Sequence, residues 1–327
     1  MALQSSVIAQ PHYDGTHYFN PFPTFQKRGN LDILKWMIWD RITGKRPPNP
    51  QKTPEFAMGA NDPNWLRQNK NQFSVTWIGH STLLIQTDGM HILTDPVFSE
   101  RCSPFSFIGP KRVMPPSPPL DLLPSVDLVV ISHDHYDHLD KRTIKTLGNK
   151  PFYVVPLGVG KILRSWGITH FAELGWGDQI VFNKMEIICT PAQHFSGRTP
   201  LNQNKTLWAS WLLKSASVTF YFGGDTGYFP GFTEIAQKYG AIDFAALPIG
   251  AYAPRWFMKP VHMNPQEALK AFKDLDARIF IPIHWGTFKL ADEPMDEPPN
   301  VLRQKASELS IEDRIWFFKH GETKISQ

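Results

Sequence analysis

The chain of 327 residues contains only two cysteines, Cys102 and Cys189, and they lie far apart in the sequence. A disulfide-stabilised scaffold is therefore not indicated, and no thiol lies among the candidate metal ligands described below. The sequence also has no basic segment followed by a long apolar run. We therefore expect neither a signal peptide nor a transmembrane span, and we predict a cytoplasmic or membrane-peripheral location.

Dense positive charge is absent as well. The formal net charge is only +4 at pH 7, and no segment combines clustered Lys and Arg with interleaved aromatic residues. A surface that binds nucleic acid needs clustered positive charge, so we expect no nucleic-acid partner. Hydrophobic residues make up 42% and charged residues 20% of the chain, which is enough apolar material for the core of an ordinary globular protein.

The first 70 residues are rich in Pro, Asn and aromatic residues, and we predict that they form an N-terminal extension to a main domain at 71–327. Their one helical pattern is LDILKWMIWDRI at 31–42, which Gly44 and Pro47 end. Apolar residues recur there every three or four positions. Two interpretations are open: this helix packs on the main domain, or it lies at a lipid surface with its tryptophans at the interface. The apolar stripe favours packing.

Short β-rich runs follow from Phe73 onward, and helical patterns lie between several of them. The runs are FSVTWIG, TLLIQT, HILTD, VDLVVIS, FYVV, MEIICTP, SVTFYFGGD, DFAALPIG and RIFIPIH. The helices are expected near residues 140–148, 158–166, 231–239, 265–274 and 300–309. The first half of this region is hairpin-like, whereas the second half alternates strand and helix. The mixture predicts an α/β fold in which two sheets pack together with helices on the outside, rather than a single doubly wound parallel sheet.

Three histidines and two aspartates lie within the six residues that follow the apolar stretch VDLVVIS. This segment reads His133, Asp134, His135, Tyr136, Asp137 and His138. Its position after an apolar strand places the side chains on a loop at a strand end, where they can converge. Imidazole and carboxylate together suit Zn, Fe or Mn better than an ion that prefers thiolates. The segment, here called the metal loop, therefore predicts a metal site.

Three later residues stand at the ends of apolar strands in the same way. They are His194 in TPAQHFSG, Asp225 in YFGGDTGY and His284 in IPIHWGT. Each one alone would more often be a hydrogen-bonded residue at a strand end than a metal ligand. Their recurrence, each with a glycine within three residues, indicates that the side chains gather at one edge of a sheet.

The order of these residues resembles the metallo-β-lactamase superfamily, in which a HxHxDH motif is followed by a later His, Asp and His. The resemblance implies an αββα four-layer sandwich and a site for two metal ions, expected to be Zn²⁺ with Fe and Mn as alternatives. It implies these ligands: His133, His135 and His194 for one metal, Asp137, His138 and His284 for the other, and Asp225 bridging both. Two closely spaced dications lower the pKa of a bound water, so that hydroxide forms near neutral pH.

Two further residues precede the metal loop. The same resemblance implies that Asp95 in ILTDPVF lies outside the ligands and orients one of them. The alternative is that Asp95 is a turn residue before Pro96. His80 in WIGHST follows a strand near the same edge, and we interpret it as either a hydrogen-bonded core histidine or a residue that supports the ligands.

Longer strings extend the resemblance from about residue 75 to the C-terminus. WIGHSTLLIQTDG, ISHDHYDHLD, PIGAYAPRWFMK and IHWGTF resemble the family of N-acyl-phosphatidylethanolamine-hydrolysing phospholipase D and its bacterial relatives. This resemblance implies a zinc-dependent phosphodiesterase that converts a membrane phospholipid to phosphatidic acid and an N-acylethanolamine. It also implies peripheral contact with the membrane and a homodimer.

Five residues are candidates for direct roles in that reaction. Asp137 and Asp225 are predicted to relay the proton of the attacking water in addition to binding metal. His262, before the expected helix start at Asn264, is predicted to bind substrate or transfer a proton, with shaping of the helix entry as the alternative. Tyr136 and Arg255 are predicted to contact a substrate phosphate. Their alternatives are a packed aromatic and an arginine bound to loop carbonyls.

The chain departs from the animal members of the family at two positions near the site. Val261 stands where a Gln is expected before His262, and Asp134 replaces an Asn in the metal loop. Both differences are expected to alter the preference for the lipid head group without changing the metal ligands.

Two competing functions remain open on the sequence. The first is a metallohydrolase of the same superfamily that acts on a soluble phosphodiester or a lactone. The second is a metal-stabilised scaffold without activity that binds lipid or a protein partner. The presence of all seven ligand types argues against such a scaffold.

Overall fold

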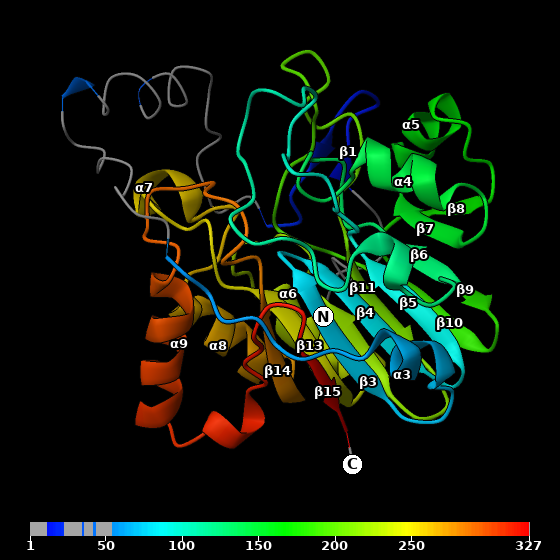
Figure 1. The fold of residues 1–327 in the computed structure, drawn as a ribbon. Coiled ribbons are helices and arrows are strands. Elements are labelled where there is room, and N and C mark those ends of the chain that lie inside the picture. The colour runs from blue at the N-terminus through cyan, green and yellow to red at the C-terminus, as the bar shows by residue number, and fades with distance from the viewer. Residues whose placement is uncertain (1–11, 23–34, 36–41, 44–53, 327) are drawn as a thin grey trace, which may run out of the picture.

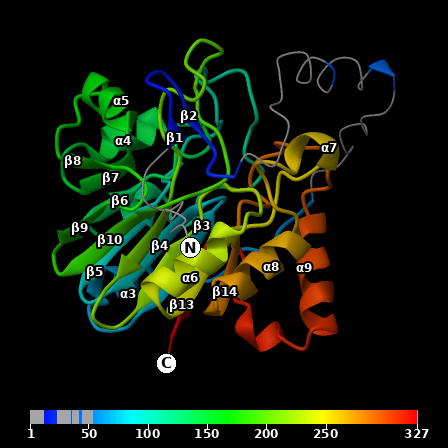
Figure 2. The same ribbon diagram turned by 180° about the vertical axis from the view of Figure 1, so that it is seen from behind.

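The computed structural model describes residues 12–22, 35, 42–43 and 54–326, and every structural statement below refers to these residues. The helix predicted at 31–42 lies outside them except for its residues 35 and 42. Two β-sheets pack face to face, and helices cover both outer faces (Figures 1 and 2). The predicted αββα sandwich is therefore confirmed.

The first sheet has six strands in the order β14-β13-β12-β11-β10-β9. Its strands are β9 (Gln179–Phe182), β10 (Met185–Thr190), β11 (Ser210–Lys214), β12 (Thr219–Phe222), β13 (Ile242–Pro248) and β14 (Ala277–Ile283). β12, β13 and β14 run parallel, whereas β9, β10 and β11 form an antiparallel meander that continues into β12.

The second sheet has seven strands in the order β15-β3-β4-β5-β6-β7-β8. Its strands are β3 (Ser74–Gly79), β4 (Thr82–Thr87), β5 (Met90–Thr94), β6 (Leu128–Val130), β7 (Phe152–Pro156), β8 (Phe171–Leu174) and β15 (Thr323–Ile325). Hairpin pairing joins β3, β4 and β5, and the strands from β5 to β8 are parallel. A separate small hairpin consists of β1 (His12–Tyr13) and β2 (Tyr18–Phe19).

The helices divide between the two outer faces. On the second sheet lie α3 (Pro63–Gln68), α4 (Lys141–Leu147) and α5 (Val159–Ser165), and on the first lie α6 (Gly231–Tyr239), α8 (Pro265–Asp274) and α9 (Glu297–Glu308). The short helix α7 (Arg255–Met258) follows β13. All five helices expected from the sequence are present, whereas α3 and α7 were not predicted. Among the described helices none is both long and apolar enough to cross a bilayer.

The alternation of side chains along β6 shows how one strand serves two cores. Leu128 and Val130 face the core between the sheets, whereas Val129 and Ile131 face the core under α3, α4 and α5. Successive residues of a strand point to opposite faces, so a strand with apolar residues at every position must be covered on both sides. The continuous apolar run before the metal loop is explained by this double burial.

The chain direction in the two sheets determines where the polar residues collect. β6 ends just before the metal loop, and β10, β12 and β14 end shortly before His194, Asp225 and His284. Because β10, β12 and β14 point in the same direction, their carboxyl ends lie at one edge of the first sheet. This edge is the top of the sandwich in Figure 1.

The start of α8 offers a test of local stability. Asn264 is the N-cap: its side chain accepts from the Glu267 amide while the Glu267 side chain accepts from the Asn264 amide. Asn264→Ala removes the first of these bonds, and we expect a loss of about 1 kcal/mol in the free energy of unfolding. Denaturant titration measures this loss. Asn264→Ser keeps a capping oxygen and should retain most of the stability, and equal losses in both variants would contradict the capping argument.

Candidate metal centre

The first group of donors consists of His133, His135 and His194, whose ligand atoms lie within 4.8 Å of one another. His133 Nε2 is 2.8 Å from His135 Nδ1, and His135 Nδ1 is 3.4 Å from His194 Nε2. Nitrogens bound to one tetrahedral zinc ion are separated by about 3.4 Å, because each metal–nitrogen distance is about 2.1 Å. The separation of His135 and His194 matches this value, whereas His133 and His135 would move apart by about 0.6 Å around a single ion.

The second group of donors consists of His80, Asp137, His138 and His284. Asp137 Oδ2 lies 3.0 Å from His80 Nε2, 3.3 Å from His138 Nε2 and 3.4 Å from His284 Nε2. The three imidazoles are almost completely buried, and the Asp137 side chain is only 14% exposed. His80, which the sequence left undecided, thus lies inside a donor group.

Asp225 lies between these two groups. Its Oδ2 atom is 3.1 Å from both His138 Nε2 and His284 Nε2, and 3.8 Å from His194 Nε2. The side chain is 2% exposed. One carboxylate oxygen therefore faces donors of both groups, which is the position that a bridging ligand needs.

Hydrogen bonds on the far side of three imidazoles determine which nitrogen faces the cluster. Nδ1 of His138 is 2.7 Å from the Asp95 carboxylate, and Nδ1 of His194 is 2.9 Å from the carbonyl oxygen of Val261. Ser132 donates its hydroxyl to Asp95, so its oxygen accepts from Nδ1 of His133. Each Nδ1 therefore carries a hydrogen, and each Nε2 offers its lone pair to the cluster.

Several buried polar atoms at the centre form no hydrogen bond with any residue that the structure describes. These are Nε2 of His138, Nε2 of His284 and Oδ1 of Asp225. Buried polar atoms without partners are rare because they lose their hydration. Although carboxylate oxygens are near the two nitrogens, the geometry does not suit a hydrogen bond. A cation between the donors would satisfy all of them, so the residues present fit a metal centre.

The pKa of each residue in the cluster depends on its burial and on the charges next to it. Burial disfavours the charged form of every histidine, and it lowers the pKa of His80 and His135 to about 3. For His284 the Asp225 and Asp137 carboxylates outweigh burial and raise the pKa to about 9. Burial alone would raise the pKa of Asp225, but His138 and His284 hold it well below its usual value. The two carboxylates are therefore ionised, and they favour positive charge at the centre, either as a proton on His284 or as a bound cation in its place.

Strained backbone and close packing accompany the donors. His80, Asp95 and His284 have φ values of 56°, 34° and 62°, in the left-handed region. This conformation costs roughly 1–2 kcal/mol for a residue with a Cβ atom. A Cβ atom at Gly250 would lie 2.1 Å from the carbonyl oxygen of His284, so only glycine allows the ends of β13 and β14 to approach so closely. Such strain is common where a site requires a particular backbone.

Asp95 is the buried residue on which the metal loop depends. One carboxylate oxygen accepts from the Ser132 amide at 2.6 Å, and the other accepts from the Ser132 hydroxyl and from Nδ1 of His138. The side chain is 0% exposed. The structure agrees with the prediction that Asp95 orients a ligand, rather than with the alternative that it only forms a turn.

Arg198 holds the metal loop from the other side. Its Nη1 atom donates to the carbonyl oxygens of Asp134 and Leu139, at 2.7 and 2.8 Å, and its guanidinium lies 3.9 Å from the centre of the Tyr136 ring. The Gly197 amide donates to the Asp134 carboxylate. The sequence analysis missed Arg198. The signal that could have found it is its position four residues after His194, on the loop that carries a predicted ligand.

The N-terminal segment also reaches the site. The side chain of Asn20 accepts hydrogen bonds from the His194 amide and from the indole of Trp208. The carbonyl oxygen of Phe22 accepts from the Gln193 side chain. Residues 20–22 therefore form part of the wall behind His194.

The three residues predicted to contact substrate have different surroundings. His262 is 8% exposed, and one of its ring nitrogens lies within 4.8 Å of ligand atoms of His194 and Asp225, so it belongs to the cluster of donors. Tyr136 donates its hydroxyl to the carbonyl oxygen of Arg198. Arg255 binds Glu267 at 2.6 Å and the carbonyl oxygen of His262. The contacts of Tyr136 and Arg255 match the alternatives named for them, and their roles toward a substrate stay predictions.

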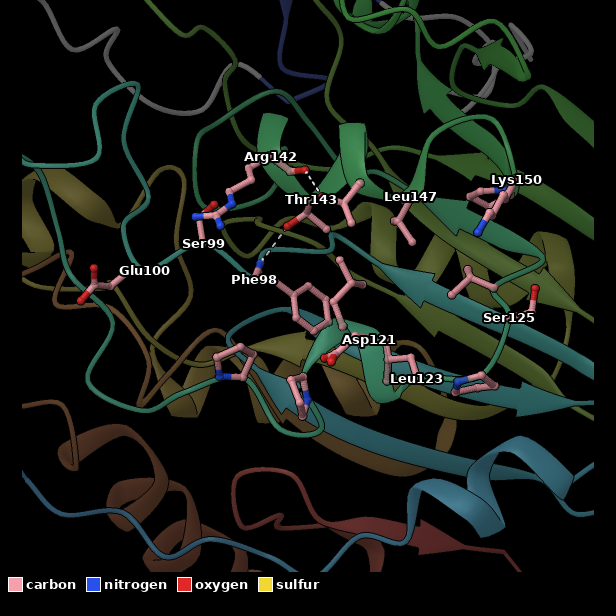
Figure 3. A pocket seen from close by; sticks show the side chains of 17 residues that line it. Phe98, Ser99, Glu100, Asp121, Leu123, Ser125, Arg142, Thr143, Leu147 and Lys150 are labelled. Atoms are coloured by element: carbon pink, nitrogen blue, oxygen red, sulfur yellow. Dashed lines mark hydrogen bonds between the residues drawn. The ribbon is translucent and has the colours of Figure 1, made fainter.

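Two hollows adjoin α4, and a third of about 20 Å³ is lined by residues that include the donor His284. One of about 710 Å³ is formed by α4 and the segment 116–126, and Figure 3 shows Arg142, Thr143 and Leu147 lining it opposite Phe98. None of the clustered donors belongs to this hollow. The second, of about 600 Å³, is lined by Tyr136 and Arg198 and therefore adjoins the metal loop. We place the chemistry at the cluster, because in the part of the chain that the structure describes only the cluster combines converging donors with unpartnered atoms.

Replacing the Asp95 carboxylate should weaken metal binding. Asp95→Asn cannot keep all its contacts, because an amide has one acceptor oxygen whereas the Ser132 amide, the Ser132 hydroxyl and His138 all donate. We expect a 10- to 100-fold loss of metal affinity with the fold retained. Competition with a coloured chelator measures the affinity, and circular dichroism checks the fold. Unchanged affinity would show that Asp95 has no influence on His138.

Arg198 should act on the same loop without contacting the donors. Arg198→Met keeps much of the side-chain volume but removes both hydrogen bonds to carbonyl groups, each worth about 1 kcal/mol or more. We expect weaker metal retention at an elevated temperature, measured as metal per chain after dialysis. Arg164→Met is the matched control, because Arg164 is exposed on α5. Equal retention in the two variants would exclude a role for Arg198 in holding the loop.

Comparison with known proteins agrees with the fold and the cluster. Residues 90–285 match the model of the beta-lactamase superfamily domain. The chain is 43% identical to N-acyl-phosphatidylethanolamine-hydrolyzing phospholipase D 1 of Caenorhabditis elegans, over 91% of this chain and 88% of that one. It is 37% identical to the mitochondrial N-acyl-phosphatidylethanolamine-hydrolyzing phospholipase D of Saccharomyces cerevisiae, over 76% of this chain and 55% of that one.

Among solved structures the chain resembles Igni18, a metallo hydrolase from Ignicoccus hospitalis. The TM-score is 0.60 with 23% sequence identity, over 79% of this chain and 99% of that one, and this likeness supports the fold. The family match and the level of identity lead to one conclusion. The chain is a metal-dependent hydrolase of the metallo-β-lactamase superfamily and belongs to the family that includes the C. elegans phospholipase D.

Proposed function

We propose that this chain is a dinuclear zinc phosphodiesterase of the phospholipase D type. Its substrate is N-acyl-phosphatidylethanolamine or a related phospholipid, and its products are phosphatidic acid and an N-acylethanolamine. The observation that carries the proposal is the position of Asp225 between two groups of buried donors, because a site for two adjacent dications suits hydrolysis of an anionic phosphodiester. The names of the C. elegans and S. cerevisiae relatives support the substrate class.

The chain would hold one ion with His133, His135 and His194, and the other with Asp137, His138 and His284, with Asp225 shared. These are the seven ligands expected from the sequence, and His80, the fourth donor of the second group, lies 3.0 Å from Asp137 Oδ2. When bound, the two ions supply an activated water near neutral pH and neutralise charge on the phosphate.

The other residues orient these donors and handle protons. Asp95 and Ser132 keep the Nε2 lone pairs of His133 and His138 directed at the centre, which limits reorganisation during the reaction. Asp137 and Asp225 are ionised and buried, so each can accept a hydrogen bond from water held between the groups and relay its proton. Their lowered pKa values favour such a relay over lasting protonation of either carboxylate.

His262 has a separate role in this proposal. Burial lowers its pKa well below 6.5, so the ring is neutral at neutral pH. A neutral imidazole keeps one N–H, and Nδ1 of His262 has no hydrogen-bond partner among the described residues. The ring can therefore donate to a phosphate oxygen or to the departing alkoxide without adding a positive charge near the cations.

Hydrolysis of the lipid tests the proposal directly. Zinc-loaded protein is incubated with N-acyl-phosphatidylethanolamine in detergent micelles. We expect phosphatidic acid and N-acylethanolamine in equal amounts. In ¹⁸O-labelled water the label should enter phosphatidic acid, because a phospholipase D breaks the bond between phosphorus and the head-group oxygen. Asp225→Asn and His133→Ala should abolish turnover, whereas His170→Ala, on an exposed loop, should retain it.

Other outcomes would point to the competing functions. Hydrolysis of bis(p-nitrophenyl) phosphate without any lipid turnover would show that the substrate is a soluble phosphodiester and not a lipid. Hydrolysis of a lactone alone would show that the substrate is a lactone and not a phosphodiester. Binding of two ions per chain without hydrolysis of any of these substrates would support the scaffold.

A further inference from the structure

A loop after β5 exposes three large apolar side chains. Phe105, Phe107 and Ile108 are 55%, 78% and 58% exposed. The rings of Phe105 and Phe107 lie 5.6 Å apart, so they form one apolar tip. Large apolar residues that are exposed together, rather than singly, indicate a surface that contacts another apolar phase.

The loop is closed at its base, which keeps the tip in place. Arg101 pairs with Lys111 in an isolated antiparallel bridge, and the Arg101 side chain donates to the carbonyl oxygen of Gly109 at 2.6 Å. The Cys102 amide donates to the carbonyl oxygen of Pro110. An exposed apolar tip on a closed base can enter an apolar phase with little loss of backbone entropy.

Cationic side chains lie next to this tip. The hollow of about 600 Å³ is lined by Phe105 together with Arg101, Lys141, Arg142, Lys145 and Arg198. Lys141, Arg142 and Lys145 are exposed on α4. The two carboxylates of the hollow already have partners. Glu100 binds Lys111 at 2.7 Å, and Asp140 accepts from Ser99 and Thr143. The surface therefore presents an excess of positive charge.

The tip and the cations lie on the same edge of the sandwich as the metal centre. The loop follows β5 and the metal loop follows β6, and these strands are parallel, so both loops leave the same edge of the sheet. Figures 1 and 2 show the loop after β5 and α4 at the upper end of the molecule, together with the segment after β10. A flat partner that contacts the tip would face the opening of the site.

We infer that Phe105, Phe107 and Ile108, together with Lys141, Arg142 and Lys145, form a surface that docks on an anionic lipid bilayer. The apolar side chains enter the acyl region, and the cations bind the phosphates of the head groups. This lipid-docking surface is distinct from the N-terminal segment 31–42, for which the sequence suggested a lipid contact. The inference deepens the proposed function, because docking would bring a bilayer lipid to the metal centre.

The charge of the surface favours a bilayer over a second copy of the chain. Two copies that met through this surface would bring like charges together around their apolar tips, which opposes association. An anionic bilayer offers the complementary combination of an apolar interior and a negative surface, and apolar and electrostatic contributions add in binding at such an interface.

Vesicle binding without substrate tests the inference independently of catalysis. The full zinc-loaded chain is sedimented with vesicles of phosphatidylcholine, or of phosphatidylcholine mixed with phosphatidylglycerol. We expect stronger binding to the anionic vesicles and weaker binding at high salt. Phe107→Ser/Ile108→Ser should lower the affinity for both vesicles by about tenfold or more. Lys141→Gln/Arg142→Gln/Lys145→Gln should lower it about fivefold per residue for anionic vesicles alone.

Control variants carry changes of the same kind elsewhere. Leu309→Ser alters an exposed apolar residue at the end of α9, and Lys238→Gln/Lys273→Gln alters exposed lysines on α6 and α8. Binding should not change in either control. Losses in the controls equal to those in the test variants would overturn the inference, and so would wild-type binding by both test variants. If Phe107→Ser/Ile108→Ser instead dissociates a dimer in sedimentation, the surface binds a second copy.

The outcomes separate docking from the proposed function. Vesicle binding without lipid hydrolysis would contradict the proposed function and leave the docking inference intact. Hydrolysis of micellar lipid without vesicle binding would overturn the docking inference and leave the proposed function intact. Turnover of bis(p-nitrophenyl) phosphate by Phe107→Ser/Ile108→Ser at the wild-type rate would show that the apolar tip acts on the membrane and not on the chemistry.

Discussion

The buried carboxylate of Asp95 is the interaction on which the site depends. Taking a carboxylate out of water is costly, and the cost is offset here because each of its oxygens accepts a hydrogen bond. The donors are the amide and hydroxyl of Ser132 and the imidazole of His138. One negative charge that lies outside the donor groups thereby fixes the start of the metal loop and the orientation of two of its histidines.

The sequence could predict most of the fold because the apolar runs are long and regular. The strand that precedes the metal loop and the capped helix at Asn264 were recognisable from local pattern alone. β8, β9, β11 and β15 were not among the predicted runs. β8, β9 and β15 are short and partly exposed, so tertiary pairing rather than local preference makes them strands. β11 is buried, but its five residues begin with Ser210 and end with Lys214, so the apolar run between them is too short to predict a strand.

The candidate site, like the fold, could be predicted only in part. The seven donors could be predicted from their residue types and order, and the structure brings their side chains together. Three properties could not be predicted. The nitrogen that each histidine directs inward depends on partners such as Val261, which lies 67 residues from His194 in the sequence. The proximity of His80 to Asp137 arises from packing of separate segments, and Arg198 acts through carbonyl oxygens, which leave no signature in a sequence.

The contact of Asn20 with the amide of His194 has a consequence for how such sites diverge. The N-terminal segment precedes the predicted main domain, yet it supplies an acceptor directly behind a donor of the cluster. Related chains that keep all seven donors but differ before residue 71 would differ in how firmly His194 is held. The firmness of a donor at the centre is therefore set in part by a segment that contains no donor itself.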